Sequence, residues 1–410
     1  ISSRDMEKGW NLKPKDIFDK RTIANMAICM EKVKEQHVKR EKAAGVVPLT
    51  PIQEWFFEQQ FLYPNHWNQA LRLKVCHSVT FNFFKQAMKC LVETHESLRL
   101  RFSKGETGWI QEYMNDNQSL DVTYIDFSKT QEQNKKVIEY ADNLQKSLDI
   151  TKGPLISAAY FNMGNQLDNE VVIIAHHLVV DMVSWQILLQ DLDVLMNQLL
   201  SGHELKLIHE ATSYKEWSNS LSSVHQGILD KEKNYWIEQK SMKFNHLSHL
   251  EKGTEGTRKQ LEGSLDAKET SGLLREVPKY YGTKVNETVL AAIALALKKF
   301  TQADDVLIDV ESHGRKPFQE EIDLSRTVGW FTSVYPVLLR DSHLISPDGD
   351  LLKYVKNIIR EVPNEGIGYG IARWINKNPA MMFPDALFSY NYLGKIDQSF
   401  FQSEFFSFHS

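Results

Sequence analysis

The sequence predicts an α/β protein built from two lobes. The chain has 410 residues, which is longer than one hydrophobic core usually supports. Helical and strand-like periodicities alternate along most of it, in two stretches separated by a mixed segment at 201–260 that is rich in Lys, Ser and His. We interpret this segment as the crossing between the lobes, with Trp217 and Trp236 as its anchors.

The first 46 residues are predicted to stand apart from the lobes. Within 1–27, the stretch KPKDIFDKRTIANMA combines a Pro-bearing turn with two short helical segments. The stretch EKVKEQHVKREKAAG that follows is charged and almost free of large apolar residues, as solvated linkers are. We therefore predict a short helical piece over 1–27, a linker over 28–46 and a first lobe over 47–220.

Elements of the first lobe lead to its most distinctive motif. Residues 131–148 repeat apolar side chains at helical spacing, and the strand-like runs 155–163 and 170–176 flank the hairpin loop GNQLDN. After Asp181 the apolar spacing is helical again. The motif HHLVVDMVSW, residues 176–185, is therefore predicted to lie on a turn from a strand to a helix.

The second lobe, predicted over 221–410, repeats the α/β pattern. Asn286 is a candidate N-cap for the apolar helix ETVLAAIALALKKF, and VLIDVE at 306–311 is predicted as a strand that runs into SHGR. Further strands are predicted at 333–339 and 387–392, with a helix at 349–361 between them.

Composition argues against several classes of protein. A net charge of −5, spread along the chain, gives no footprint for nucleic acid. The longest apolar runs are far shorter than the roughly 20 residues that span a bilayer, and the first residues lack the features of a secretion signal. Cys29, Cys76 and Cys90 have no metal-ligand spacing. We expect reduced thiols in a cytoplasmic protein without a membrane or nucleic-acid partner.

The two histidines of the motif invite a chemical interpretation. Adjacent side chains on a strand point to opposite faces, so a metal site that uses both His176 and His177 is not expected. His177 is the last residue before the turn and can reach a cavity as a general base, while Asp181 can fix the turn or orient the ring. A hydrogen-bonded core histidine fits the pattern equally well.

A second constellation is ESHGRKP at 311–317. Glu311 ends a predicted strand, and its carboxylate is either an acid/base group or the ion-pair partner of Arg315, the interpretation that the sequence favours. RTVGWFTSVYPV at 326–337 fits a packed loop, and SYNYLG at 389–394 fits an edge strand that ends in a Gly turn.

Taken in order, these motifs resemble the condensation-domain superfamily of nonribosomal peptide synthetases. The resemblance covers about 47–410 and is carried by LTPIQEWFFEQ, HWNQ, HESLRLRF, HHLVVDMVSW, ESHGR, RTVGWFTSVYPV, GIGYG and NYLG. WNQ, VVDMVSW and TVGWFT are similar to the epimerization branch. Residues 1–27 resemble the end of a peptidyl carrier domain, without the serine that carries phosphopantetheine, and the sequence stops before the closing strands that the family normally has.

The resemblance implies a fold and an activity. The fold would be two lobes of the chloramphenicol-acetyltransferase type, arranged in a V around a central tunnel. The activity would be L-to-D epimerization at Cα of an aminoacyl or peptidyl thioester, tethered through the phosphopantetheine of the carrier. Adenylation and carrier domains upstream and a condensation domain downstream would be the partners. No diffusible cofactor and no metal are implied.

The resemblance also assigns roles to residues. His177 and Glu311 would be the acid/base pair on opposite walls, one from each lobe, with His176 and Asp181 supporting the motif. Other implied positions are Asn391 and Tyr392 near the reacting centre and Met182, Trp185 and Trp330 along the tunnel.

Met182 stands where the family usually has Gly. If the backbone there has a positive φ, a side chain costs on the order of 1–2 kcal/mol, although we expect the turn to survive. The alternatives to an epimerase are a condensation domain that forms an amide bond and a non-catalytic docking module of the synthetase. Heterocyclization is not expected, because its aspartate-bearing motif is not seen.

Overall fold

The structure is a computed structural model, and it divides the chain into two units, residues 1–43 and 44–410. It describes residues 10–11, 31–32, 44–114, 120, 122–165, 167–207, 211–224, 226–241, 253, 257–302, 305–319, 321–340, 349–394 and 403–408. In the first unit, β1 (Trp10–Asn11) pairs antiparallel with β2 (Glu31–Lys32). The short helices predicted within 1–27 lie outside the described residues.

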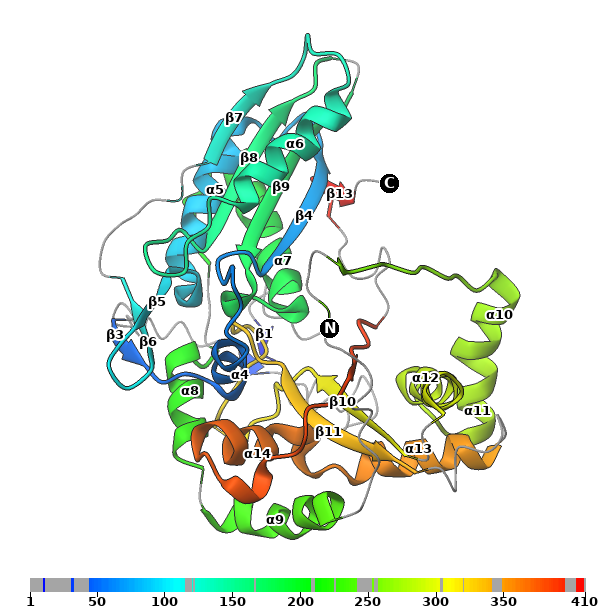
Figure 1. The fold of residues 1–410 in the computed structure, drawn as a ribbon. Helices are drawn as coiled ribbons and strands as arrows, with labels where there is room; N and C mark the ends of the chain where they lie inside the picture. Colours follow the sequence, from blue (N-terminus) through cyan, green and yellow to red (C-terminus); the bar gives the residue numbers. More distant parts are fainter. Residues whose placement is uncertain are drawn as a thin grey trace. The chain divides into compact units, whose positions relative to one another are not determined.

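A five-stranded mixed sheet dominates the first half of the second unit (Figure 1). Its strand order is β13-β4-β9-β8-β7, and β7 with β8 is the parallel pair. The strands are β4 (Asn68–Val75), β7 (Val122–Asp126), β8 (Ile156–Asn162), β9 (Asn169–His176) and β13 (Phe406–Phe408). The hairpin predicted over 155–176 is confirmed, because β8 and β9 pair antiparallel.

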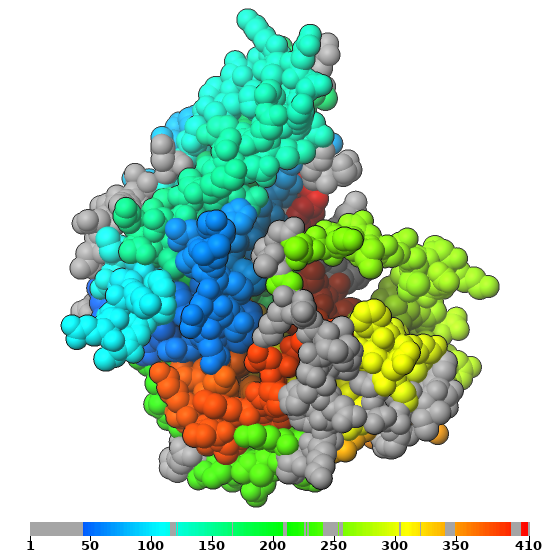
Figure 2. Space-filling model, in the orientation of Figure 1, coloured from blue at the N-terminus to red at the C-terminus, as the bar shows by residue number. Residues whose placement is uncertain are grey.

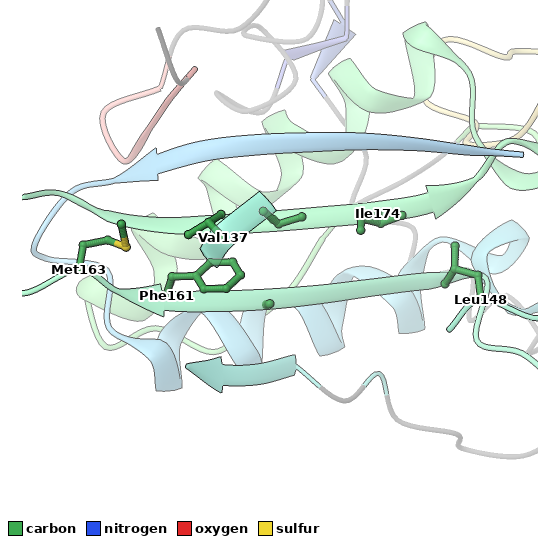
Figure 3. Packing of buried hydrophobic residues seen from close by; sticks show 7 residues of the cluster. Val137, Leu148, Phe161, Met163 and Ile174 are labelled. Atoms are coloured by element: carbon green, nitrogen blue, oxygen red, sulfur yellow. The ribbon is translucent and has the colours of Figure 1, made fainter. Parts of the chain in front are cut away.

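Helices cover both faces of this sheet. The helix predicted at 131–148 is confirmed as α6 (Gln133–Gln145), which packs on a cluster formed by Val137, Phe161, Val172 and Ile174 (Figure 3). On the other face, Ile173 meets α5 (Phe81–Thr94) and α7 (Met182–Leu200). Alternate residues of β9 therefore serve two cores, which explains its long apolar run.

A smaller three-stranded sheet, β3-β6-β5, and helix α4 complete this half. They span β3 (Gly45–Val47), β5 (Leu100–Lys104), β6 (Trp109–Tyr113), α4 (Pro51–Glu58) and the 3₁₀ turn η1 (Glu96–Arg99). Two longer helices, α8 (Tyr214–Ser222) and α9 (Gln226–Ser241), occupy the predicted crossing. Trp217 and Trp236 anchor them, since both side chains are buried.

The second half is built around another mixed sheet, ordered β11-β10-β12. It consists of β10 (Val306–Ser312), β11 (Ser333–Leu339) and β12 (Phe388–Tyr390), with β10 antiparallel to β11 and parallel to β12. The strands predicted at 306–311, 333–339 and 387–392 are thus confirmed.

Helices pack against this sheet as well. They are α10 (Ala267–Ser271), α11 (Val277–Tyr281), α12 (Val285–Thr301), α13 (Gly349–Glu361) and α14 (Ile367–Gly370), with the π-helical segments η4 (Gly272–Glu276) and η7 (Ile371–Ile375) and the 3₁₀ turns η6 (Pro363–Gly366) and η8 (Pro379–Met381). The predicted N-cap Asn286 is wrong. Glu287 accepts a hydrogen bond from the backbone N–H of Lys284 at 2.7 Å, so Lys284 is the cap and the helix begins at Val285, before the predicted start.

The two halves touch through α4 and the last described strand. On the face in Figure 2, the α4 region in blue lies against the orange segment of α14 and η7, where Glu58 pairs with Arg373 at 2.9 Å and accepts from Trp374 at 2.8 Å. Strand β13 pairs antiparallel with β4, so a strand from the end of the chain joins the sheet of the first half. The predicted mixed α/β class is confirmed.

Candidate active site

The histidine motif occupies the predicted turn from strand to helix. Strand β9 ends at His176, the 3₁₀ turn η2 (His177–Val179) follows, and α7 begins at Met182 with Asp181 as its N-cap. The strand therefore stops one residue before His177. The turn, and not the alternation of a strand, sets the directions of the two rings.

His176 is used entirely for structure. Its ring is buried; Nε2–H donates to the backbone carbonyl of Pro64 at 2.8 Å, and Nδ1 accepts from the N–H of Leu178 at 3.2 Å. The edge of the ring meets Phe56. Burial lowers the pKa of His176 to about 4, so the ring stays neutral and pins the turn to the segment before β4.

His177 has a different environment. Its side chain is half-buried and lies on Trp330, with ring centroids 4.4 Å apart. Nδ1 is 2.8 Å from the carbonyl oxygen of Val180, and Nε2 is 2.8 Å from the amide nitrogen of Gln69 on β4. Loss of hydration lowers the pKa of His177 below its usual value. The ring is thus a neutral imidazole.

Asp181 ties the motif to the second half of the chain. Its carboxylate accepts from the N–H of Ser184 at 2.7 Å, which caps α7, and from the N–H of Phe331 at 3.3 Å. It also pairs with Arg315 at 2.9 Å, and both side chains are buried. The predicted ion pair between Arg315 and Glu311 is therefore wrong, because the guanidinium turns to Asp181.

Arg315 makes further contacts at the same junction. It donates to the carbonyls of Leu324 at 3.0 Å and Thr327 at 2.7 Å, and its guanidinium lies 3.9 Å from the centre of the Phe331 ring. The ESHGR, RTVGWFT and HHLVVD motifs therefore meet at one buried cation.

Glu311 lies near the end of β10, opposite Val334 of β11. The carboxylate is half-buried and accepts a long hydrogen bond of 3.5 Å from Ser389 Oγ. Burial, with a contribution from Asp309 on the same face of the strand, raises the pKa of Glu311. The pKa of Asp309 rises to about 6, mainly through burial.

Asn391 and Tyr392 follow directly after β12. Tyr390 pairs with Val310 in the parallel register, so Asn391 continues toward Glu311, while Tyr392 is 39% exposed. Among the described residues, no hydrogen bond or ion pair links Glu311 to His177. The connection runs along the chain: Trp330 touches His177, and four residues later Val334 pairs with Glu311.

Met182 and the two tryptophans also lie at this turn. Met182 is the first residue of α7 and is absent from the positive-φ positions, so the strain considered for it does not arise. Trp330 is buried and packs on Trp55 and Phe56 as well as on His177. Trp185 is buried and donates from Nε1 to Oε1 of Gln69 at 2.8 Å.

Gln69 is the residue that sequence reasoning missed. The WNQ motif contains it, but the contact of its side chain with His177 depends on the pairing of β4 with β9, where Gln69 lies opposite Ala175. Within the described part of the chain, no group of three or more His, Cys, Asp or Glu is arranged to hold a metal ion. None of the described helices has the length and apolarity to cross a membrane.

Comparisons with known proteins place this geometry in a family. A linear gramicidin synthase of Brevibacillus parabrevis is 38% identical over 417 residues, which cover 97% of this chain but 5% of that protein. Bacitracin synthase 3 of Bacillus licheniformis is 32% identical over 415 residues, which cover 99% of this chain and 6% of the relative. The chain thus spans a small part of each of these proteins.

Solved structures give the same assignment. The epimerization domain from the third module of tyrocidine synthetase B superposes with a TM-score of 0.79 and 30% identity, over 90% of this chain and 84% of that one. The family described as Condensation domain matches residues 43–409, and the chain belongs to this family.

Proposed function

We propose that residues 47–410 form an epimerization domain, which interconverts the L and D configurations at Cα of a carrier-bound aminoacyl or peptidyl thioester. The observation that carries the proposal is the pair of groups with opposite pKa shifts: the pKa of His177 is lowered and that of Glu311 is raised. Such shifts bring a base and an acid toward the same working pH. Similarity to the tyrocidine epimerization domain supports the same choice.

The chemistry requires one proton to leave and another to arrive. The thioester carbonyl acidifies the Cα–H bond, and an unprotonated base takes the proton while the electron pair moves into an enolate. An acid on the opposite face then delivers a proton to Cα and inverts the centre. Neutral His177 is suited to accept at Nε2, and Glu311, whose pKa is raised, to donate from its carboxyl group. The two groups exchange roles when the D-form returns.

Neighbouring residues would hold the reacting group. Asn391, beside Glu311, and Tyr392 would donate hydrogen bonds to the enolate oxygen, which stabilises the developing charge. Trp330 would pack against the substrate next to His177. Asp181 and His176 would act by fixing the turn, as their buried hydrogen bonds indicate.

The substrate and partners follow from the same proposal. Phosphopantetheine of an upstream carrier domain would present the thioester, an adenylation domain would select its amino acid, and a condensation domain would receive the D-product. Direct proton transfer at a thioester needs no diffusible cofactor.

Hydrogen exchange at Cα tests the proposal. The module that carries this domain is loaded with an L-aminoacyl-phosphopantetheine, incubated in D₂O and hydrolysed, and the released acid is analysed by mass and chirality. We expect deuterium at Cα and accumulation of the D-isomer, with both lost in His177→Ala and Glu311→Gln. Asp309→Asn is the matched control, because Asp309 lies on the same face of β10 and should keep the exchange.

Two other outcomes contradict the proposal in different ways. A new amide bond between two carrier-bound substrates, without deuterium at Cα, identifies a condensation domain. Absence of exchange with a panel of loaded amino acids identifies a non-catalytic docking module.

A further inference from the structure

A continuous line of hydrogen bonds runs through His177. Trp185 Nε1 lies 2.8 Å from Oε1 of Gln69, Nε2 of Gln69 lies 2.8 Å from Nε2 of His177, and Nδ1 of His177 lies 2.8 Å from the carbonyl oxygen of Val180. The line begins on α7, crosses β4 and returns to the turn before α7.

The chemistry of its two ends fixes the direction of every bond. The indole N–H of Trp185 only donates, so the atom of Gln69 that it meets must be the amide oxygen. The other end of the same amide is then the NH₂ group, which also only donates, and Nε2 of His177 must accept. The remaining ring proton sits on Nδ1, facing the Val180 carbonyl, which only accepts.

We propose that Gln69, held by Trp185, is a positioning residue that keeps His177 as the neutral Nδ1–H tautomer and disfavours its protonation at Nε2. This inference rests on the proposed function, since it concerns the lone pair that would take the Cα proton. The substrate must displace the Gln69 amide from Nε2 before proton transfer, and the amide returns afterwards.

The arrangement acts on the protonated ring. An imidazolium carries a hydrogen on Nε2 and needs an acceptor there, but the oxygen of Gln69 is already bound by Trp185. The NH₂ group that remains repels the ring proton, so the imidazolium returns its proton readily. Among the charged and titratable groups nearby, Asp181 favours the imidazolium but is paired with Arg315, and His176 is neutral.

Three variants test this wiring. Gln69→Glu keeps the shape but replaces the donor by an acceptor, and Gln69→Leu removes the donor. Trp185→Phe leaves Gln69 in place but frees its oxygen, so that the amide can turn over. Gln133→Leu is the matched control: Gln133 also donates from its amide, to the carbonyls of Phe127 and Met163, and no hydrogen bond joins it to His177 among the described residues.

The measurement is the ring ¹⁵N spectrum of the full chain with labelled histidine, followed against pH. The chain has 14 histidines, and His177→Gln assigns the signal. We expect the Nδ1–H tautomer in the unaltered protein. The pKa of His177 should rise by at least one unit in Gln69→Glu, less in Gln69→Leu and Trp185→Phe, and stay unchanged in Gln133→Leu.

The outcomes separate this inference from the proposed function. An Nε2–H tautomer in the unaltered protein, or an unchanged pKa in Gln69→Glu, overturns the role of Gln69 whether or not the domain turns over substrate. Where Gln69→Leu fails to fold, the isosteric glutamate decides. In the D₂O assay, the low-pH limb of the exchange rate should move upward by the same interval as the pKa in Gln69→Glu, and an unmoved limb also contradicts the inference.

Discussion

Replacing Arg315 with Met is expected to lower the free energy of unfolding by about 3–5 kcal/mol. Arg315 and Asp181 are only 8% and 7% exposed, so the carboxylate left behind cannot recover its hydration. The carbonyls of Leu324 and Thr327 lose a donor in the same step, which adds to the destabilisation. Methionine retains most of the apolar stem, so lost packing contributes little.

Urea unfolding followed by tryptophan fluorescence measures this change. Arg340→Met is the matched control, because Arg340 pairs with Asp305 at 3.8 Å and is 34% exposed. Water screens such a pair, so its loss should cost at most about 1 kcal/mol. If Arg315→Met destabilises no more than Arg340→Met, the buried junction does not have the energetic role given to it here.

A double-variant cycle isolates the ion pair from other contacts of Arg315. Asp181→Asn keeps an amide oxygen that can cap α7, but it removes the charge. The variant that carries both substitutions should be more stable than the sum of the two effects predicts, by about 1 kcal/mol or more, because no unpaired charge is left. Simple additivity would show that the two side chains do not stabilise each other.

Three further outcomes follow from the structure. Met182→Gly should lower the free energy of unfolding by about 0.5–1 kcal/mol and leave Cα exchange within a few-fold, since Met182 begins a helix; a large gain in exchange would show that Met impairs the turn. His176 has a folded pKa of about 4 against 6.5, so the unfolded state binds more protons between these values, and stability should fall by about 3 kcal/mol as the pH drops from 6.5 to 4, a loss that is smaller in His176→Gln. Asp309 has the opposite sign: its pKa of about 6 means that stability is lost as the pH rises from the unfolded pKa toward 6, so Asp309→Asn should be more stable than the unaltered protein at pH 8 and closest to it near pH 4 in urea unfolding.

Local patterns were sufficient to predict most elements of the second unit. Apolar spacing located α6, β8, β9 and β10, because each buries one or two faces whose period is visible in a short window. The start of α12 was misplaced, since a Glu at the third helical position selected Lys284 as the cap. The pairing of β13 with β4 joins residues more than 300 positions apart, and no local pattern predicts it.

The pairing of Arg315 shows why the site was harder to predict. Closeness in sequence favoured Glu311 as its partner, but Gly314 intervenes with a φ of +63°. A side chain at this position would collide with the backbone carbonyl of Phe331. Glycine therefore permits the chain to turn against the RTVGWFT loop, and the turn carries Arg315 to Asp181, 134 residues away.

Most polar groups of the histidine turn have complete structural roles, and this supports the choice of His177 and Glu311 as the reacting groups. Ser184 Oγ donates to the carbonyl of Gly329 at 2.8 Å and accepts from its N–H at 3.0 Å, so the two motifs are joined at a single residue's backbone. Asp181 and His176 are buried and fully engaged in comparable bonds. A proton acceptor or donor must instead be partly exposed and weakly held. His177 meets this condition because an amide N–H is a replaceable partner, and Glu311 meets it because its hydrogen bond to Ser389 is long.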